Sequence, residues 1–365
     1  MTTEKKAEKK AEEKGRARAG RKAGAKSGNR ASKWAAGTIA LVASVSAVAP
    51  AHAVALPSDG TARSAVGAAT VDCSSHRPGL AQRLAADMAK RLKSRRSMAS
   101  LALYDRTTAT TCTYGAHKRY DSASTVKPIV LGALLLAGKG NLTAKEAELA
   151  RKMIVNSDNA ATTTLWRKLS DTSNPQKPNP VAIQRFLNAA GMRDTVLDRT
   201  GNWGLTQISA ADQITLLKLF TGRGNAVLSH ASRAYALRLM HAVEKDQRWG
   251  TPAGAPDTST IQVKNGWLQR SQNGPRDPFD RGDWKVNSLG AFTGGRYDYG
   301  LAVLTENNRV PKGRPATDGW YYGIDTIEQV SRAAHHALYP DRSPSHGYTP
   351  PRPGRAAVKQ AMTVG

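Results

Sequence analysis

The sequence predicts an α+β fold: a five-stranded antiparallel sheet flanked by terminal helices, with a separate helical lobe. Three observations lead to this prediction. A helical pattern and two strand-like runs open the patterned part of the chain, a block of helical patterns follows, and three strand-like runs with a final helix close it. Because strands come from both ends and helices lie between them, one antiparallel sheet with a helical insert accounts for the order.

The first elements are recognised by the spacing of apolar side chains. Residues 79–94 repeat apolar side chains at helical intervals, which predicts an amphipathic helix. Residues 98–105 and 111–119 are short strand-like runs, and the polar residues between them predict a hairpin. Further helices are expected over about 124–138, 143–155, 159–169, 181–190, 209–221 and 229–246.

Strands return toward the C-terminus, at 258–264, 284–293 and 296–305. Gly294-Gly295 between the last two runs is a strong signal for a two-residue hairpin turn. A closing helix is expected over 325–338, where apolar residues recur at helical spacing.

The N-terminal region is typical of an export signal. Residues 1–33 are basic and contain almost no apolar side chains, whereas 34–53 carry no charge and end on small residues. An uncleaved membrane anchor is the alternative, because the apolar run is near the minimum length for crossing a bilayer. We expect four segments: a basic segment and signal peptide (1–53), a linker (54–72), one folded domain (73–340) and a disordered tail (341–365).

The charge of the chain bears on its partners. The 365 residues carry a net charge of +26, and residues 1–33 hold 12 Lys/Arg against four Asp/Glu. No zinc-finger spacing, basic-zipper heptad or RNA-binding aromatic motif is present, so we expect no nucleic-acid partner. For an exported chain, an anionic polymer of the cell envelope fits this charge better. We expect a secreted or otherwise extracytoplasmic monomer.

The two cysteines, Cys73 and Cys112, both follow the expected signal. An even pair in an oxidising compartment predicts one disulfide, with two buried thiols as the alternative. The pair is too sparse for a Cys-x-x-Cys metal site, and we expect neither a metal nor a cofactor.

A serine and a lysine stand at the start of an apolar helix in "DSASTVKPIVLGALL". Ser124 and Lys127 lie one helical turn apart, and the residues after them are apolar nearly all round the helix. Burial disfavours the charged form of a lysine, and a neutral amine beside a serine can remove the hydroxyl proton. Taken alone, the pair is more often a capping serine with a lysine that reaches toward solvent.

Two further motifs follow. Ser157-Asp158-Asn159 stands at the break between two expected helices, where Ser and Asn are often caps. Lys264-Asn265-Gly266 ends the strand "STIQVK", where a glycine allows close backbone approach. Each motif alone has an ordinary structural explanation, but the three in this order are far more specific.

In that order, the motifs resemble the Ser-x-x-Lys, Ser-Asp-Asn and Lys-Thr-Gly signature of class A β-lactamases and penicillin-binding proteins. The runs "LTAKEAELARKMIVNSDNAATTTLW" and "VNSLGAFTGGRYDYGLAVLTEN" resemble the family's helix–loop–helix and its last hairpin. The resemblance covers about 73–339 and implies that 73–340 is a β-lactamase-like catalytic domain with a β-lactamase/transpeptidase-like fold.

The resemblance also implies roles. Ser124 is the nucleophile, and Lys127 is its base, directly or through water. Ser157 relays a proton to the leaving nitrogen, and Lys264 supplies positive charge for a substrate carboxylate. The backbone N–H groups of Ser124 and Trp267 form the oxyanion hole. The substrate-binding residues are Asn159, Asn265, Gly266 and Trp267.

Two departures from the family pattern matter. The third motif has Asn265 in place of threonine, and an amide can still donate a hydrogen bond to a carboxylate. The glutamate that serves as base for deacylation in class A enzymes is missing. Gly201 stands where it would fall, and no Glu or Asp occurs between Asp198 and Asp212.

We therefore expect an exported serine hydrolase that forms an acyl-enzyme with β-lactams or D-Ala-D-Ala-like cell-wall peptides and deacylates slowly. Two alternatives stay open. In the first, the chain is a true class A β-lactamase that hydrolyses β-lactam antibiotics. In the second, it is a module that binds penicillin or wall peptides without turnover.

Overall fold

The structure is a computed structural model that describes residues 60–222, 224, 226–270, 283–308, 313–315 and 317–351. The chain divides into two units, Met1–Val54 and Ala55–Gly365, and every described residue belongs to the second. The predicted signal peptide over 1–53 lies outside the described residues. No described helix is both long and apolar enough to cross a bilayer.

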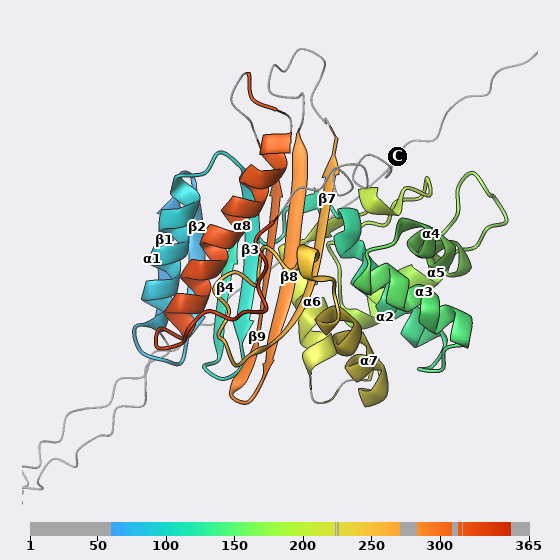
Figure 1. The fold of residues 1–365 in the computed structure, drawn as a ribbon, viewed down its shortest axis with the longest axis horizontal. Helices are drawn as coiled ribbons and strands as arrows, with labels where there is room; N and C mark the ends of the chain where they lie inside the picture. Colours follow the sequence, from blue (N-terminus) through green and yellow to red (C-terminus); the bar gives the residue numbers. More distant parts are fainter. Residues whose placement is uncertain are drawn as a thin grey trace, which may run out of the picture. The chain divides into compact units, whose positions relative to one another are not determined.

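The fold is α+β, as predicted, and the expected strands and helices follow one another as predicted, but four strands were not expected: two before the first helix, one just before the helical block and one within it (Figure 1). The strands are β1 (Gly60–Val66), β2 (Ala69–Ser75), β3 (Met98–Asp105), β4 (Thr110–Tyr114), β5 (Arg119–Asp121), β6 (Gln207–Ser209), β7 (Thr260–Gln269), β8 (Trp284–Gly294) and β9 (Tyr297–Glu306). The α-helices are α1 (Leu80–Lys93), α2 (Lys127–Ala137), α3 (Ala144–Val155), α4 (Asn159–Lys168), α5 (Val181–Ala190), α6 (Ala210–Thr221), α7 (His230–His241) and α8 (Thr317–Leu338). Three short 3₁₀ helices are η1 (Ala123–Val126), η2 (Trp203–Leu205) and η3 (Lys245–Gln247).

The main sheet has seven antiparallel strands in the order β1-β2-β4-β3-β9-β8-β7. Helices α1 and α8 pack side by side on one face of it (Figure 1). Helix α6 packs against β9 and β3, and α7 packs against β7. Helices α2 to α5 form the predicted helical lobe, which lies beyond the β7 edge (Figure 1). The lobe therefore faces the strand that carries the third motif.

The sheet is larger than the five strands predicted, because β1 and β2 form a hairpin where residues 54–72 were expected to be a linker. Strand β1 is an edge strand of small and polar side chains that alternate between half-buried and exposed, so its apolar signal is weak. Gly67, with φ +59°, forms the turn. The folded domain thus includes residues 60–72 and does not begin at 73.

The tail prediction is also wrong for residues 341–351. Pro344 forms a bridge with Pro256, and the Ser345 N–H donates to the Ala255 carbonyl oxygen at 2.7 Å. The Tyr348 hydroxyl donates to the Glu328 carboxylate at 2.7 Å. This Pro- and Ser-rich segment is held by isolated hydrogen bonds and forms no helix or strand. Its sequence therefore shows no hydrophobic periodicity from which its order could be predicted.

The predicted disulfide is confirmed. Cys73 on β2 and Cys112 on β4 are direct partners in the strand register and are joined by a disulfide. The bond fastens the N-terminal hairpin to the rest of the sheet.

Candidate active site

Ser124 and Lys127 meet at the junction of η1 and α2. Ala123, at the start of η1, has a positive φ of 47°, which turns the chain sharply out of β5. Lys127 is the first residue of α2, whose apolar side chains are buried almost all round, and the lysine is itself 0% exposed. The expected buried lysine at the start of an apolar helix is therefore present.

The buried amine of Lys127 is held by the second motif. Its Nζ donates to the Ser157 carbonyl oxygen at 2.6 Å, to Ser157 Oγ at 3.0 Å and to Asn159 Oδ1 at 2.9 Å. Lys264 reaches the same serine from β7, because its Nζ donates to Ser157 Oγ at 2.9 Å. The Ser157 hydroxyl thus lies between two lysine amines, and one residue from each predicted motif is brought together.

The Lys127 amine is not bonded to the Ser124 hydroxyl, so of the two predicted routes, direct or through water, the direct hydrogen bond is not present. Among the described residues, no side chain forms a hydrogen bond with the Ser124 hydroxyl, and Ser124 is partly exposed. Catalytic hydrogen bonds are often long in an empty site and tighten when substrate binds. The nucleophile is therefore accessible, and the base one turn away is held by other partners.

Both amines have a strongly lowered affinity for protons. Burial lowers the pKa of Lys127 well below its ordinary value, the nearby Lys264 charge lowers it further, and Asp158 opposes these effects. Burial lowers the pKa of Lys264 from 10.5 to about 7. An uncharged Lys127 can accept a proton at neutral pH, which is the property that the sequence analysis required of it.

Strand β7 packs against η1, the short helical turn that carries Ser124 and that we call the nucleophile turn. A Cβ added at Gly266 would lie 2.7 Å from the backbone nitrogens of both Ser124 and Thr125. The glycine is therefore needed for close packing of β7 on η1, rather than for the approach of a ligand alone. The backbone N–H groups of Ser124 and Trp267 stay predicted oxyanion donors at this contact.

The substrate role predicted for Asn265 is wrong for its side chain. Successive side chains of a strand alternate between its faces, so Asn265 points away when Lys264 points into the site. Its Nδ2 donates to the Gln247 and Trp249 carbonyl oxygens at 2.7 and 2.9 Å, and the residue is fully buried. Trp267 lies on that same side, 5.7 Å from Trp249 between ring centroids.

A tryptophan lies near the position where the glutamate of class A enzymes was expected. The loop before it is held by Asp198, whose Oδ1 accepts hydrogen bonds from the backbone nitrogens of Thr200 and Asn202 at 2.9 Å each. The ring centroid of Trp203 then lies 5.0 Å from Lys127 Nζ. Among the described residues, no carboxylate forms a hydrogen bond with the Lys127 or Lys264 amine. Trp203 was not predicted as a site residue, although a large aromatic side chain stands only two residues after Gly201 in the sequence.

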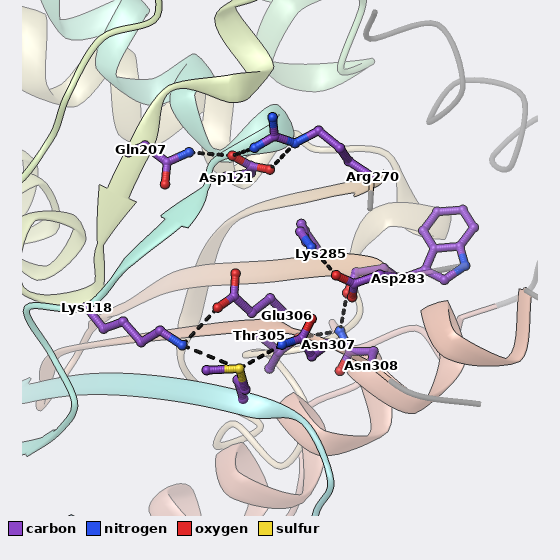
Figure 2. A network of polar contacts seen from close by, with 12 residues as sticks. Lys118, Asp121, Gln207, Arg270, Asp283, Lys285, Thr305, Glu306, Asn307 and Asn308 are labelled. Atoms are coloured by element: carbon purple, nitrogen blue, oxygen red, sulfur yellow. Dashed lines mark hydrogen bonds and ion pairs between the residues drawn. The ribbon is translucent and has the colours of Figure 1, made fainter. Parts of the chain in front are cut away.

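An ion pair that the sequence did not reveal supports the nucleophile turn from behind. The Asp121 carboxylate, at the end of β5, accepts two hydrogen bonds from Arg270 at 2.9 Å each and a third from Gln207 (Figure 2). Asn287 of β8 donates to the Asp121 carbonyl oxygen at 2.8 Å. These contacts connect β5 and β6 to the main sheet directly before Ser124.

A separate polar network surrounds the start of β8 and the end of β9. Lys285 pairs with Asp283, and the Lys118 Nζ lies 2.8 Å from a Glu306 carboxylate oxygen (Figure 2). The carboxylates of Asp283 and Glu306 are paired with these lysines. Within the described part of the chain, they form no hydrogen bond with the cluster of Lys127, Ser157, Asn159 and Lys264, which we call the lysine–serine cluster. No group of three or more His, Cys, Asp or Glu side chains suited to a metal occurs among the described residues.

Comparisons with known proteins agree with this geometry. The model of the β-lactamase enzyme family matches residues 140–338, which is more than half of the chain. No curated protein gives a significant match by sequence.

Solved structures of class A β-lactamases share the fold. A variant of the last common ancestor of the class A β-lactamases of Gram-negative bacteria is 21% identical, covers 70% of this chain and 98% of its own, and gives a TM-score of 0.53. A β-lactamase from Xanthomonas campestris is 18% identical, with coverage of 71% and 98% and a TM-score of 0.55. One from Streptosporangium roseum is 17% identical, with coverage of 70% and 98% and a TM-score of 0.54. The chain therefore belongs to the β-lactamase enzyme family and is a serine hydrolase that acts on amide bonds.

Proposed function

We propose that the protein is an exported hydrolase that acylates Ser124 with β-lactams or D-Ala-D-Ala-like wall peptides and releases the acyl group slowly. One observation carries the proposal. The Ser157 hydroxyl bridges the buried amines of Lys127 and Lys264, both of lowered pKa, and Lys127 stands one helical turn after Ser124. No carboxylate among the described residues forms a hydrogen bond with either amine.

Acylation has every group it needs. The neutral Lys127 amine takes the Ser124 proton, directly or through water, while Ser124 Oγ attacks the amide carbonyl carbon. The backbone N–H groups of Ser124 and Trp267 stabilise the oxyanion, and such donors contribute about 10²–10³ in rate. The proton then passes from Lys127 through Ser157 Oγ to the leaving nitrogen, along a hydrogen bond of 3.0 Å. The charged form of Lys264 attracts the substrate carboxylate.

Deacylation is the weak step. In class A enzymes, a glutamate serves as the base that activates water for this step. Here Gly201 and Trp203 occupy that part of the loop, so the glutamate that would activate the water is missing from it. The acyl-enzyme is therefore long-lived.

Labelling with a fluorescent penicillin, followed by a chase, tests the proposal. The wild type should acquire one label that persists for many minutes, and Ser124→Ala should acquire none. Ser94→Ala, at the exposed end of α1, is the matched control and should label normally. A wild type that never labels contradicts the proposal.

The two alternatives give different results in the same assay. Rapid loss of label with fast hydrolysis of a chromogenic cephalosporin would identify an efficient β-lactamase. Label that never leaves, together with no cleavage of a D-Ala-D-Ala peptide, would identify a binding module.

Export is a separate part of the proposal. The basic and apolar N-terminal segments and the disulfide support it, because disulfides persist outside the cytoplasm. The mature protein should be recovered outside the cytoplasmic membrane with a new N-terminus near residue 54. Full-length protein in the cytoplasmic fraction would contradict export.

A further inference from the structure

Trp203 belongs to none of the three motifs, yet it contacts the central amine. The side chain is 5% exposed, its ring centroid lies 5.0 Å from Lys127 Nζ, and its Nε1 donates to Thr163 Oγ1 at 3.1 Å. The hydrogen bond to α4 fixes the plane of the indole beside the lysine. The ring is therefore a rigid neighbour of the base rather than a mobile loop side chain.

The same tryptophan borders a polar cavity. The cavity has a volume of about 300 Å³, and Asn159, Thr163, Arg167, Asn202 and Trp203 are among the residues that line it. Lys127 is fully buried and is not one of the lining residues. Because Trp203 and Asn159 both contact the Lys127 amine and both line the cavity, they form the wall between the two.

Hydrolysis of the acyl-enzyme with Lys127 as the base requires water at this wall. The water oxygen must attack the ester carbon while a base takes one of its protons, and the Ser124 oxygen then leaves and takes the proton back. Lys127 is the base at hand, and a water must come within about 2.6–3.2 Å of its nitrogen to be activated. The indole of Trp203 occupies space beside that nitrogen, so cavity water is kept from the amine.

We propose that Trp203 is a positioning residue that excludes water from Lys127 and so sets the lifetime of the acyl-enzyme. The inference rests on the proposed function, since it concerns the release of an acyl group from Ser124. Removal of the ring would join the polar cavity to the amine and give the water both a base and hydrogen-bonding partners.

The decay of the penicilloyl enzyme, followed by intact-protein mass spectrometry, tests this proposal. Trp203→Ala should shorten the lifetime by at least about tenfold, since a correctly placed general base contributes about 10²–10⁴ in rate. Trp203→Phe keeps an aromatic wall and should decay at nearly the wild-type rate. Thr163→Val loosens the indole but leaves it in place, so it should shorten the lifetime much less than Trp203→Ala.

Two measurements separate water exclusion from general loosening of the loop. Added indole should refill the space in Trp203→Ala and restore slow decay. The accelerated decay should also rise with pH as the Lys127 amine loses its proton. Trp203→Leu, with a smaller loss of volume, serves if the alanine variant does not fold.

The failures are distinguishable. A folded Trp203→Ala enzyme that labels normally but decays at the wild-type rate overturns this inference and leaves the proposed function standing. Equal acceleration in Thr163→Val, with no response to indole, also overturns it. A wild type that never labels removes the proposed function and this inference together.

Discussion

Ser157 presents two of its atoms to one amine. Its carbonyl oxygen and its hydroxyl both accept hydrogen bonds from Lys127, and its backbone has a positive φ of 54°. A non-glycine residue in this region costs about 1–3 kcal/mol and persists where its surroundings hold it. Here Asp158 caps α4 through the Ala161 N–H at 2.6 Å, which fixes the turn from the other side. This strained backbone conformation lets both Ser157 oxygens face the Lys127 amine.

The titration of Lys264 should govern how carboxylate substrates acylate the enzyme. Its pKa of about 7 means that the amine is charged below pH 7 and loses that charge as pH rises. We expect the acylation efficiency for a penicillin to fall by about tenfold or more above this pH, because a charged hydrogen bond contributes about 1.5–3 kcal/mol. The pH profile of acylation by stopped-flow fluorescence measures this.

An uncharged substrate provides the control for that profile. The methyl ester of the same penicillin has no carboxylate to attract, so its acylation should not fall above pH 7. Lys264→Gln should weaken the penicillin reaction and remove its alkaline fall. An equal fall for acid and ester would show that Lys264 does not recognise the carboxylate.

The order of the three motifs predicted Ser124, Lys127, Ser157, Asn159 and Lys264, and the structure brings the last four into one hydrogen-bonded cluster. Asn265 was misjudged because a motif does not tell which face of a strand each residue takes. Trp203 was missed because its position over the Lys127 amine depends on the path of a loop 76 residues away in sequence, which local patterns do not encode.

At the level of elements, strand β5 leads directly into the nucleophile turn and is anchored to β7. The anchor is the pair of hydrogen bonds from Arg270 to the buried Asp121 carboxylate. We expect Arg270→Ala to destabilise the fold by about 3 kcal/mol, because it removes the two charged hydrogen bonds that Arg270 makes to the buried Asp121 carboxylate. Urea unfolding gives the free-energy change, and the same variant should acylate more slowly.

A double substitution provides the check on that explanation. Asp121→Asn combined with Arg270→Gln removes both charges, so it should lose less stability than the sum of the two single changes. Strict additivity would mean that the two side chains act independently. Arg270→Lys keeps the charge but loses the two-pronged contact, and should fall between wild type and Arg270→Ala.

Elements with strong periodicity were predicted well, and weakly patterned ones were not. Helix α2 and strands β8 and β9 are long or strongly apolar, and the sequence indicates them clearly. Strand β1 lies at the sheet edge with one side half-exposed, and its small polar side chains resemble a linker. Such a strand is stabilised by its pairing with β2 rather than by its own composition.

For the whole molecule, the disulfide fastens the two N-terminal strands to the sheet. Cys73 and Cys112 are 39 residues apart, and a closed loop of this size stabilises a fold by about 2–4 kcal/mol. A Cys73→Ala/Cys112→Ala double variant should lose that amount in denaturant unfolding. Reductant should lower the midpoint of the wild type to that of the variant, and an unchanged midpoint in the variant would contradict the prediction.

The pairing of β3 with β9 has a consequence for biosynthesis. Met98 is the register partner of Glu306, so one edge of β3 has no neighbour until β9, the last described strand, has left the ribosome. Pairings between such distant segments form late and slowly. The nascent polypeptide therefore cannot complete its main sheet until synthesis is almost finished.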